Sequence, residues 1–275
     1  MSKIAALQLR SDGDLQANLL RAGELIQEAA VAGAQLVVLP EHFAYYNWKD
    51  LPRAAMQERT PTGPAREFLA DQARLHALWL VGGTLPLFKN SGDTKPCAAS
   101  LLINPVGREV ARYDKMHLFD ASVSNSDVTG VTRRYCESDR YQRGDAITVV
   151  STPLGALGLS VCYDLRFPEM YRVMANQGVE LIVAPSAFTA ATGKAHWELL
   201  LRARAIDNLC YVVGANICHR DHPAKPTWGG SMIVSPWGDI LARMDGEEGF
   251  VIADVDIGTL ATVRSNLPIL EHRRF

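Results

Sequence analysis

The residues best suited to chemistry in this 275-residue chain are a cysteine and a glutamate that each follow a short apolar run. Cys162 ends the run at 157–161 and begins the segment CYDLRFPE. A strand that turns into a helix presents the side chain at the turn, and the helix N-terminus favours a thiolate and a neighbouring oxyanion. The pattern therefore predicts a nucleophilic thiol, or else a small buried apolar side chain, as most free cysteines are.

Acyl transfer through a thiol needs a base that accepts its proton and a cation that holds the oxyanion. Glu41 follows the apolar run 36–39 and Pro40, at the exit of a buried strand, where desolvation raises the pKa of a carboxylate toward neutrality. The structural alternative is a salt-bridged loop carboxylate. Spacing alone also leaves open a cysteine–histidine pair that uses His117 or His196.

The elements that position these residues follow from the apolar periodicity. Residues 15–29 have helical spacing and stop at Gly33, whereas 36–39 is a continuous apolar run typical of a strand buried on both faces. Beyond them we expect a helix near 64–77, a strand near 79–85 and a hairpin with its turn at 104–107.

The second half of the chain repeats this order. The segment AGAQLVVLP at 32–40 matches QGVELIVAP at 177–185, and the turn NPVGR at 104–108 matches SPWGD at 235–239. Two tandem domains are one interpretation of such a repeat. However, the candidate base lies in the first half and the candidate thiol in the second. We therefore expect a single domain over 1–275 of the α/β class, a four-layer α-β-β-α sandwich built from two similar halves.

Composition excludes several classes of function. The formal net charge is −2 without a run of basic residues, which argues against nucleic acid as a partner. No apolar stretch approaches the roughly 20 residues of a membrane span. The five cysteines are an odd number without the density of a disulfide scaffold, so we expect reduced thiols and a cytoplasmic location. Cys218, His219 and His222 lack a paired Cys-x-x-Cys, so no metal is expected.

Four motifs, taken together and in order, carry a family resemblance. They are PE at 40–41, YDKMHL at 113–118, CES at 136–138 and VCYDLRFPE at 161–169. Their order and context resemble the successive signatures of the nitrilase, or carbon–nitrogen hydrolase, superfamily. The resemblance extends over nearly the whole chain, including HWE at 196–198 and the helix-like segment after it.

The resemblance implies a role for each matching position. Glu41 is the general base, Lys115 stabilises the oxyanion, Cys162 is the nucleophile and Glu137 orients the triad. The backbone N–H of Tyr163 is the second expected oxyanion donor. Without the motif, Lys115 is more simply a solvated loop lysine. The implied chemistry proceeds through a thioester and needs no metal or organic cofactor.

Within the superfamily, the motifs resemble most the branch that acts on deaminated glutathione, and next the omega-amidase branch that acts on α-ketoglutaramate. The expected reaction hydrolyses the terminal amide of a small carboxylate-bearing substrate to an acid and ammonia. We expect Arg166, Phe188 and Thr189 to bind substrate. The aromatic residues after the candidate base either line the cleft or cover the core: Phe43, Tyr45, Tyr46 and Trp48.

Two further expectations concern partners. The C-terminal tail, about 257–275, has exposed-looking basic residues, and in resembling proteins this tail helps a dimer form, so we expect a homodimer or higher even oligomer. A hypothesis from a different class is a catalytically silent relative that serves as a binding protein. Loss of a triad member would favour it, but all four implied catalytic residues are present.

Overall fold

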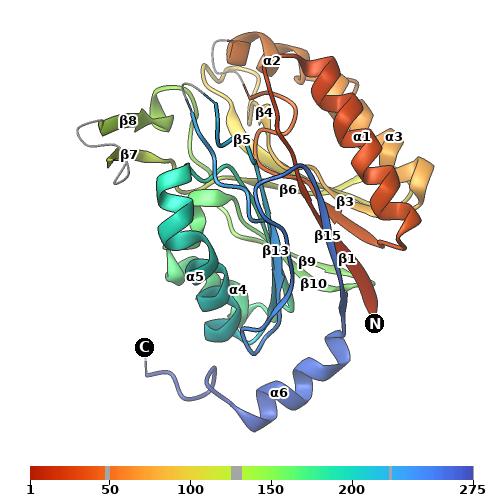
Figure 1. The fold of residues 1–275 in the computed structure, drawn as a ribbon, viewed down its shortest axis with the longest axis vertical. Coiled ribbons are helices and arrows are strands. Elements are labelled where there is room, and N and C mark those ends of the chain that lie inside the picture. The colour runs from red at the N-terminus through yellow and green to blue at the C-terminus, as the bar shows by residue number, and fades with distance from the viewer. Residues whose placement is uncertain (47–49, 125–131, 223–224, 275) are drawn as a thin grey trace.

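The computed structural model describes residues 1–46, 50–124, 132–222 and 225–274. Two large sheets lie between pairs of helices (Figure 1). The first sheet has the order β15-β1-β2-β3-β5-β4, with β6 paired to β5. Its strands are β1 (Ser2–Gln8), β2 (Leu36–Val38), β3 (Trp79–Val81), β4 (Leu85–Leu87), β5 (Cys97–Ile103), β6 (Glu109–Asp114) and β15 (Gly249–Val255).

The second sheet repeats the pattern with the order β14-β13-β12-β11-β10-β9. Its core strands β10, β11 and β12 run parallel, as β1, β2 and β3 do in the first sheet. The strands are β9 (Thr148–Thr152), β10 (Gly155–Leu159), β11 (Leu181–Ser186), β12 (Tyr211–Asn216), β13 (Met232–Val234) and β14 (Ile240–Arg243). The predicted duplication is therefore visible in the two sheets.

Helices cover the outer faces of both sheets. Helices α1 (Leu15–Val31) and α3 (Pro64–His76) cover the first sheet, while α4 (Pro168–Asn176) and α5 (Ala190–Asn208) cover the second (Figure 1). Side chains along a strand point alternately to the two faces of the sheet, so each sheet packs against the other sheet on one face and against helices on the other. In β1, Ile4 and Ala6 belong to the core cluster shared with the second sheet, whereas Ala5 and Leu7 pack in the cluster that includes α1. The predicted α-β-β-α sandwich is confirmed.

Local details differ from the sequence prediction in one place. The expected strand at 79–85 is two short strands, β3 and β4, which are separated by Gly82 and Gly83. Gly83 has a φ of 50°, which ends the extended backbone there. A separate two-stranded sheet follows β6, formed by β7 (Asp120–Ser124) and β8 (Thr132–Cys136).

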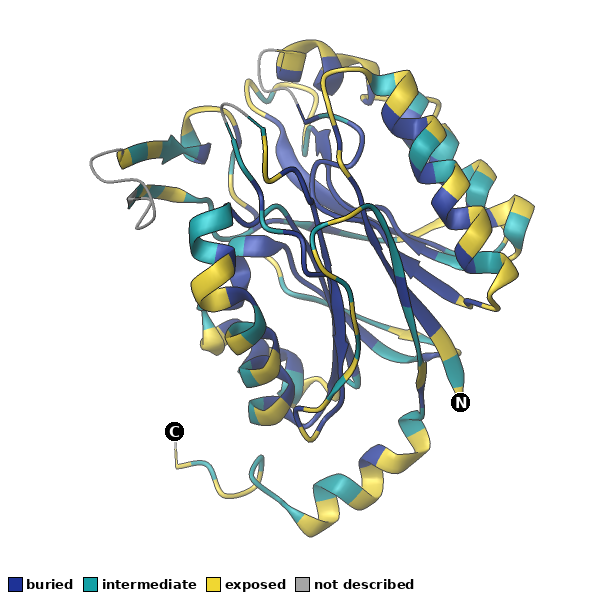
Figure 2. Ribbon diagram, in the orientation of Figure 1, coloured by how far each residue is buried: buried dark blue, intermediate teal, exposed yellow. Residues whose placement is uncertain are grey.

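The C-terminal part of the chain returns to the first half. Strand β15 pairs antiparallel with β1 along its length, from Ser2 opposite Val255 to Gln8 opposite Gly249. The chain then continues through η4 (Ile257–Thr259) and α6 (Leu260–Asn266), which lies apart from the sandwich and is largely exposed (Figures 1 and 2). The remaining helix, α2 (Leu51–Gln57), lies beside β4. Within the described part of the chain, no helix is long and apolar enough to cross a membrane.

Candidate active site

Cys162 occupies a sharp turn at the end of the β10 segment. The chain leaves β10, passes Ser160 and Val161, and enters the short helix η3 (Cys162–Arg166) before α4 begins at Pro168. Cys162 has a φ of 48°, a left-handed conformation that is unfavourable for a residue with a Cβ atom. The strand-to-helix turn predicted at this cysteine is therefore present, although its first helical turn is of the 3-10 type.

Glu41 lies beyond the end of β2, and its carboxylate is buried. The Nζ atom of Lys115 lies 2.8 Å from the Oε1 atom of Glu41. Lys115 follows β6 directly and is only 1% exposed, so its interpretation as a solvated loop lysine is wrong. The structural alternative for Glu41 is correct in part, because this carboxylate does form an ion pair.

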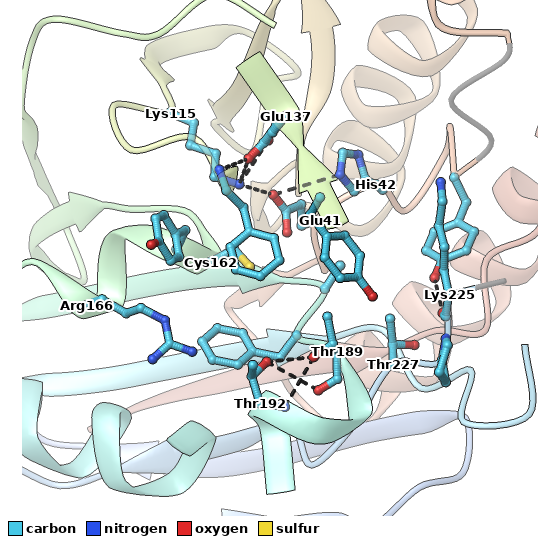
Figure 3. Close-up of a pocket in the computed structure, with 17 residues that line it drawn as sticks. Glu41, His42, Lys115, Glu137, Cys162, Arg166, Thr189, Thr192, Lys225 and Thr227 are labelled. Atoms are coloured by element: carbon cyan, nitrogen blue, oxygen red, sulfur yellow. Dashed lines mark hydrogen bonds and ion pairs between the residues drawn. The ribbon is translucent and has the colours of Figure 1, made fainter. Parts of the chain in front are cut away.

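Glu137 completes the buried charge cluster. It begins η2 (Glu137–Asp139), and its two carboxylate oxygens lie 2.8 and 3.0 Å from the Nζ atom of Lys115. The backbone N–H of Phe119 donates a 2.6 Å hydrogen bond to the same carboxylate. Lys115 is thus held between two glutamates that come from different parts of the first half (Figure 3).

The thiol of Cys162 meets this cluster through Glu41. Both side chains line the same pocket, and each shifts the pKa of the other, while the backbone of Ala187 also acts on the pKa of the thiol. The histidines considered from spacing have other partners, since His117 Nδ1 lies 2.7 Å from Asp164 and His196 Nδ1 lies 3.3 Å from Arg166. The base placed at the thiol is therefore a carboxylate rather than an imidazole.

The electrostatics of the cluster correct the sequence prediction for Glu41. Burial favours a higher pKa for this carboxyl, but the Lys115 ammonium outweighs burial and holds the pKa below its usual value. The predicted rise is therefore wrong. At Glu137 burial outweighs the same ammonium, so its pKa is raised. Burial opposes the charge on Lys115, yet the two glutamates raise its pKa well above the usual value.

The thiol itself is not activated in the resting site. Burial, together with the neighbouring Glu41 carboxylate, raises the pKa of Cys162 well above that of an ordinary cysteine. The thiolate expected from the helix N-terminus is therefore absent at rest. The carboxyl is ionised and the thiol is neutral, as a proton transfer from sulfur to oxygen requires. Both pKa shifts oppose that transfer at rest, so it has to accompany attack of the sulfur on a substrate.

A pocket opens beside the cluster (Figure 3). It is lined by 17 residues: Glu41, His42, Tyr46, Lys115, Phe119, Tyr135, Glu137, Cys162, Tyr163, Arg166, Ala187, Phe188, Thr189, Thr192, Lys225, Pro226 and Thr227. All the residues predicted for the site are in this set. Arg166 and Lys225 lie on opposite sides of it in Figure 3, with Thr189 between them. The role of the Tyr163 backbone N–H stays a prediction.

Several pocket residues were not predicted. Thr192 and Lys225 lie in segments without a recognisable catalytic pattern, and His42 directly follows the motif at 40–41 but was assigned no role there. The aromatic residues after Glu41 divide between the two interpretations: Tyr46 lines the pocket, whereas Phe43 is in the core. The hydroxyl of Tyr45 bonds Glu58, and Trp48 lies outside the described residues. Among the residues that the structure describes, no group of three histidine, cysteine or acidic side chains is arranged to hold a metal ion.

Known proteins resemble this chain over nearly its whole length. A family model described as carbon-nitrogen hydrolase matches residues 3–265. The deaminated glutathione amidase of Yersinia enterocolitica is 37% identical over 100% of this chain and 93% of its own length. The human omega-amidase NIT2 is 37% identical over 99% of this chain and 95% of its own length.

Two solved structures share the fold. Saccharomyces cerevisiae Nit3, described as a member of branch 10 of the nitrilase superfamily, has a TM-score of 0.88 and 31% identity, and the match covers 100% of this chain and 97% of that one. A mutant amidase from Nesterenkonia sp. AN1 has a TM-score of 0.79 and 27% identity, with 98% of both chains covered. Its description reports Michael addition of acrylamide at the active site cysteine. From its sequence and its fold alike, this chain belongs to the carbon–nitrogen hydrolase family and is a hydrolase of amide carbon–nitrogen bonds.

Proposed function

We propose that this enzyme is a cysteine-dependent amidase in which Cys162 is the nucleophile, Glu41 the general base and Lys115 the oxyanion donor. One observation carries the proposal. Cys162, Glu41 and Lys115 line one pocket, and the Glu41 carboxylate lies 2.8 Å from the Lys115 ammonium. Glu137 keeps that ammonium in place through two further contacts.

The chemistry proceeds in two stages. In the first, Glu41 accepts the Sγ proton while the sulfur attacks the amide carbonyl, and Lys115 with the Tyr163 backbone N–H holds the developing oxyanion. The protonated Glu41 then gives this proton to the departing nitrogen, which leaves a thioester on Cys162. In the second stage Glu41 takes a proton from water as the water oxygen attacks the thioester. Glu41 then returns this proton to the departing sulfur, so the acid and the free thiol are released.

The proposed substrate is anionic. Burial lowers the pKa of Lys225 to about 8, so this residue still carries a proton at neutral pH. Two cations, Arg166 and Lys225, therefore line the pocket in addition to the Lys115 that the glutamates neutralise. Such groups suit the carboxylates of a 2-oxo acid amide. Given the names of the relatives, we propose deaminated glutathione as the first substrate and α-ketoglutaramate as the alternative.

Arg166, Phe188 and Thr189 form the proposed substrate-binding group. The guanidinium of Arg166 lies 5.5 Å from the ring centre of Phe188 and 5.8 Å from that of Tyr163, which fixes the cation at the pocket wall. We expect Arg166→Met to raise KM by about tenfold, with a much smaller change in kcat, because it removes a contact shared by ground and transition states. A fall in kcat with unchanged KM would contradict this assignment.

The test compares three amides: deaminated glutathione, α-ketoglutaramate and propionamide. Hydrolysis of either of the first two amides yields the same 2-oxo acid. The departing amine is cysteinylglycine for deaminated glutathione and ammonia for α-ketoglutaramate, so the ammonia expected from the sequence applies only to the second substrate, and both amines are measured. We expect kcat/KM for deaminated glutathione to exceed that for propionamide by at least about a hundredfold, because only the former carries carboxylates. Equal slow rates on all three would refute the anionic substrate.

Matched cysteine variants test the nucleophile. Cys162→Ala is expected to abolish turnover, whereas Cys210→Ala, at a cysteine buried in the core, leaves it close to wild type. Mass spectrometry of the wild type under turnover is expected to detect the acyl group on the Cys162 peptide. Normal turnover by Cys162→Ala would refute the assignment. Absence of turnover in every protein would favour the catalytically silent binding protein.

We also propose that the protein is a cytoplasmic homodimer or higher even oligomer. The five cysteines are free, which supports a reducing compartment. Large apolar side chains are exposed on α5 and on the β13–β14 turn, since Leu199 is 68% and Trp237 64% exposed. Arg264 of α6 donates to the carbonyl of Leu209 at the end of α5, which places the tail beside this surface. A monomer mass by light scattering at micromolar concentration would contradict the proposal.

A further inference from the structure

Asp164 is a completely buried carboxylate, two residues after the nucleophile, to which the proposed chemistry assigns no task. Its side chain contacts four donor groups. Oδ2 accepts 2.8 Å hydrogen bonds from the backbone N–H of Val161 and from the hydroxyl of Tyr113. Oδ1 accepts a 3.1 Å bond from the backbone N–H of His117 and lies 2.7 Å from its ring Nδ1. All of its hydrogen-bonding capacity is directed at two short segments.

These two segments carry the nucleophile and the oxyanion cation. The first, 161–164, is the turn that contains Cys162, and the second, 113–117, contains Lys115. Asp164 also closes its own turn, because its backbone N–H donates a 3.0 Å bond to the carbonyl of Val161. The Asp164 side chain therefore joins the two segments to each other.

The left-handed backbone of Cys162 needs such support. A residue with a Cβ atom in this region costs about 1–3 kcal/mol and persists only when its surroundings fix it. Two hydrogen bonds between Val161 and Asp164 span the strained residue on either side. A buried carboxylate that lost its donors would itself be strongly destabilised, so the turn and the Lys115 segment are held in one relative position.

We infer that Asp164 is a positioning residue, which holds the Cys162 turn and the Lys115 segment together so that sulfur and ammonium reach the same carbonyl group. The inference rests on the proposed function. Asp164 does not line the pocket, so it acts on the reaction through the residues that it holds. Tyr113 and His117 are the partners through which the second segment is attached.

Two variants test the inference, and they differ in how strongly they disturb the hydrogen bonds of Asp164. Asp164→Asn replaces one carboxylate oxygen with an amide NH2 group, which would then face two hydrogen-bond donors. Tyr113→Phe removes a single hydroxyl and keeps the ring. We expect kcat to fall by about a hundredfold in Asp164→Asn and about tenfold in Tyr113→Phe, with KM within about threefold of wild type, because small misplacement of reacting groups acts on the rate. Tyr211→Phe is the matched control, since Tyr211 is another buried tyrosine whose hydroxyl bonds, at 3.3 Å, the carbonyl of Asp256.

A second readout does not depend on turnover. Chloroacetamide alkylates a thiol and carries an amide that the Lys115 site can orient, whereas methyl methanethiosulfonate reacts with a thiol and has no amide. The ratio of the two rates at Cys162 is expected to fall about tenfold in both variants and to stay unchanged in Tyr211→Phe. If the wild type lacks amidase activity, the proposed function fails, but this ratio still tests the positioning.

The inference would be overturned by Tyr113→Phe with wild-type kcat and a wild-type alkylation ratio. It would also be overturned if Tyr113→Phe and Tyr211→Phe lost kcat in the same proportion to their loss of thermal stability. The fall in kcat would then reflect a general loss of structure. Should Asp164→Asn fail to fold, Tyr113→Phe and its control decide the question alone.

Discussion

Lys115 is the residue on which the charge balance of the site depends. It is the ammonium between two buried carboxylates, so Lys115→Met leaves both without their cation. We expect the variant to lose about 3–5 kcal/mol of unfolding free energy, and amide turnover with it. Adding Glu137→Gln is expected to recover part of the stability but none of the activity, because one uncompensated carboxylate is gone while the proposed oxyanion donor is still missing. Chemical denaturation and the amide assay measure the two effects, and wild-type stability in Lys115→Met would refute this view of the cluster.

His42 makes the stability of the protein depend on pH. Burial lowers its pKa from 6.5 to about 4, so the imidazole is neutral in the folded protein and takes up a proton more readily in the unfolded chain. The unfolding free energy is therefore expected to fall as the pH drops from 6.5 toward about 4, by about 3 kcal/mol from this residue. In His42→Gln, denaturation curves between pH 6.5 and about 4 should show a smaller loss of unfolding free energy. His272→Gln, at an exposed histidine, should match the wild type. An equal slope in His42→Gln would disprove the assignment.

At the scale of residues, the sequence located the side chains of the proposed site but not their electrostatics. Four motifs located Glu41, Lys115, Glu137 and Cys162. Whether the pKa of Glu41 is raised or lowered depends on its contact with Lys115. Lys115 lies 74 residues away in sequence, and no local sequence pattern indicates that contact.

At the scale of elements, the break between β3 and β4 supports the loop that carries the proposed base. Gly83 lies against Pro40, where a Cβ atom would come within 2.1 Å of the Pro40 carbonyl oxygen. Gly83→Ala therefore forces this backbone apart, in addition to the strain of its positive φ. We expect a loss of roughly 3 kcal/mol in unfolding free energy and a larger fall in kcat than in KM. Gly92→Ala is the control, because a Cβ atom there would meet nothing within 4 Å.

The longer elements were predictable because their signals are local. The helix expected over 15–29 is α1, whose N-cap Asp14 accepts from the backbone N–H of Ala17. The helix near 64–77 is α3. The prediction of one continuous strand over 79–85 is wrong, because the chain turns between β3 and β4. The sequence shows two glycines there, but it does not show that Gly83 packs closely against Pro40.

At the scale of the whole molecule, the duplication predicted the two sheets but not how they are joined. The quoted repeats lie in β2 and β11 and in the hairpin turns of each sheet. The pairing of β15 with β1 places the last strand of the chain beside the first. A contact between residues so far apart in sequence produces no periodic pattern of apolar residues.

This pairing makes the two halves interdependent, which supports the prediction of a single domain. Strand β15 belongs to the first sheet but is supplied after the last strand of the second, and one core cluster contains residues of both sheets, such as Ile4 and Ile182. Neither half can therefore bury its inner face alone. We expect urea unfolding followed by tryptophan fluorescence and by far-ultraviolet circular dichroism to give one coincident transition. Deleting 249–275 is expected to abolish folding, whereas deleting 268–275 keeps β15 and the transition. Two separate transitions in the full chain would show that the halves are independent domains.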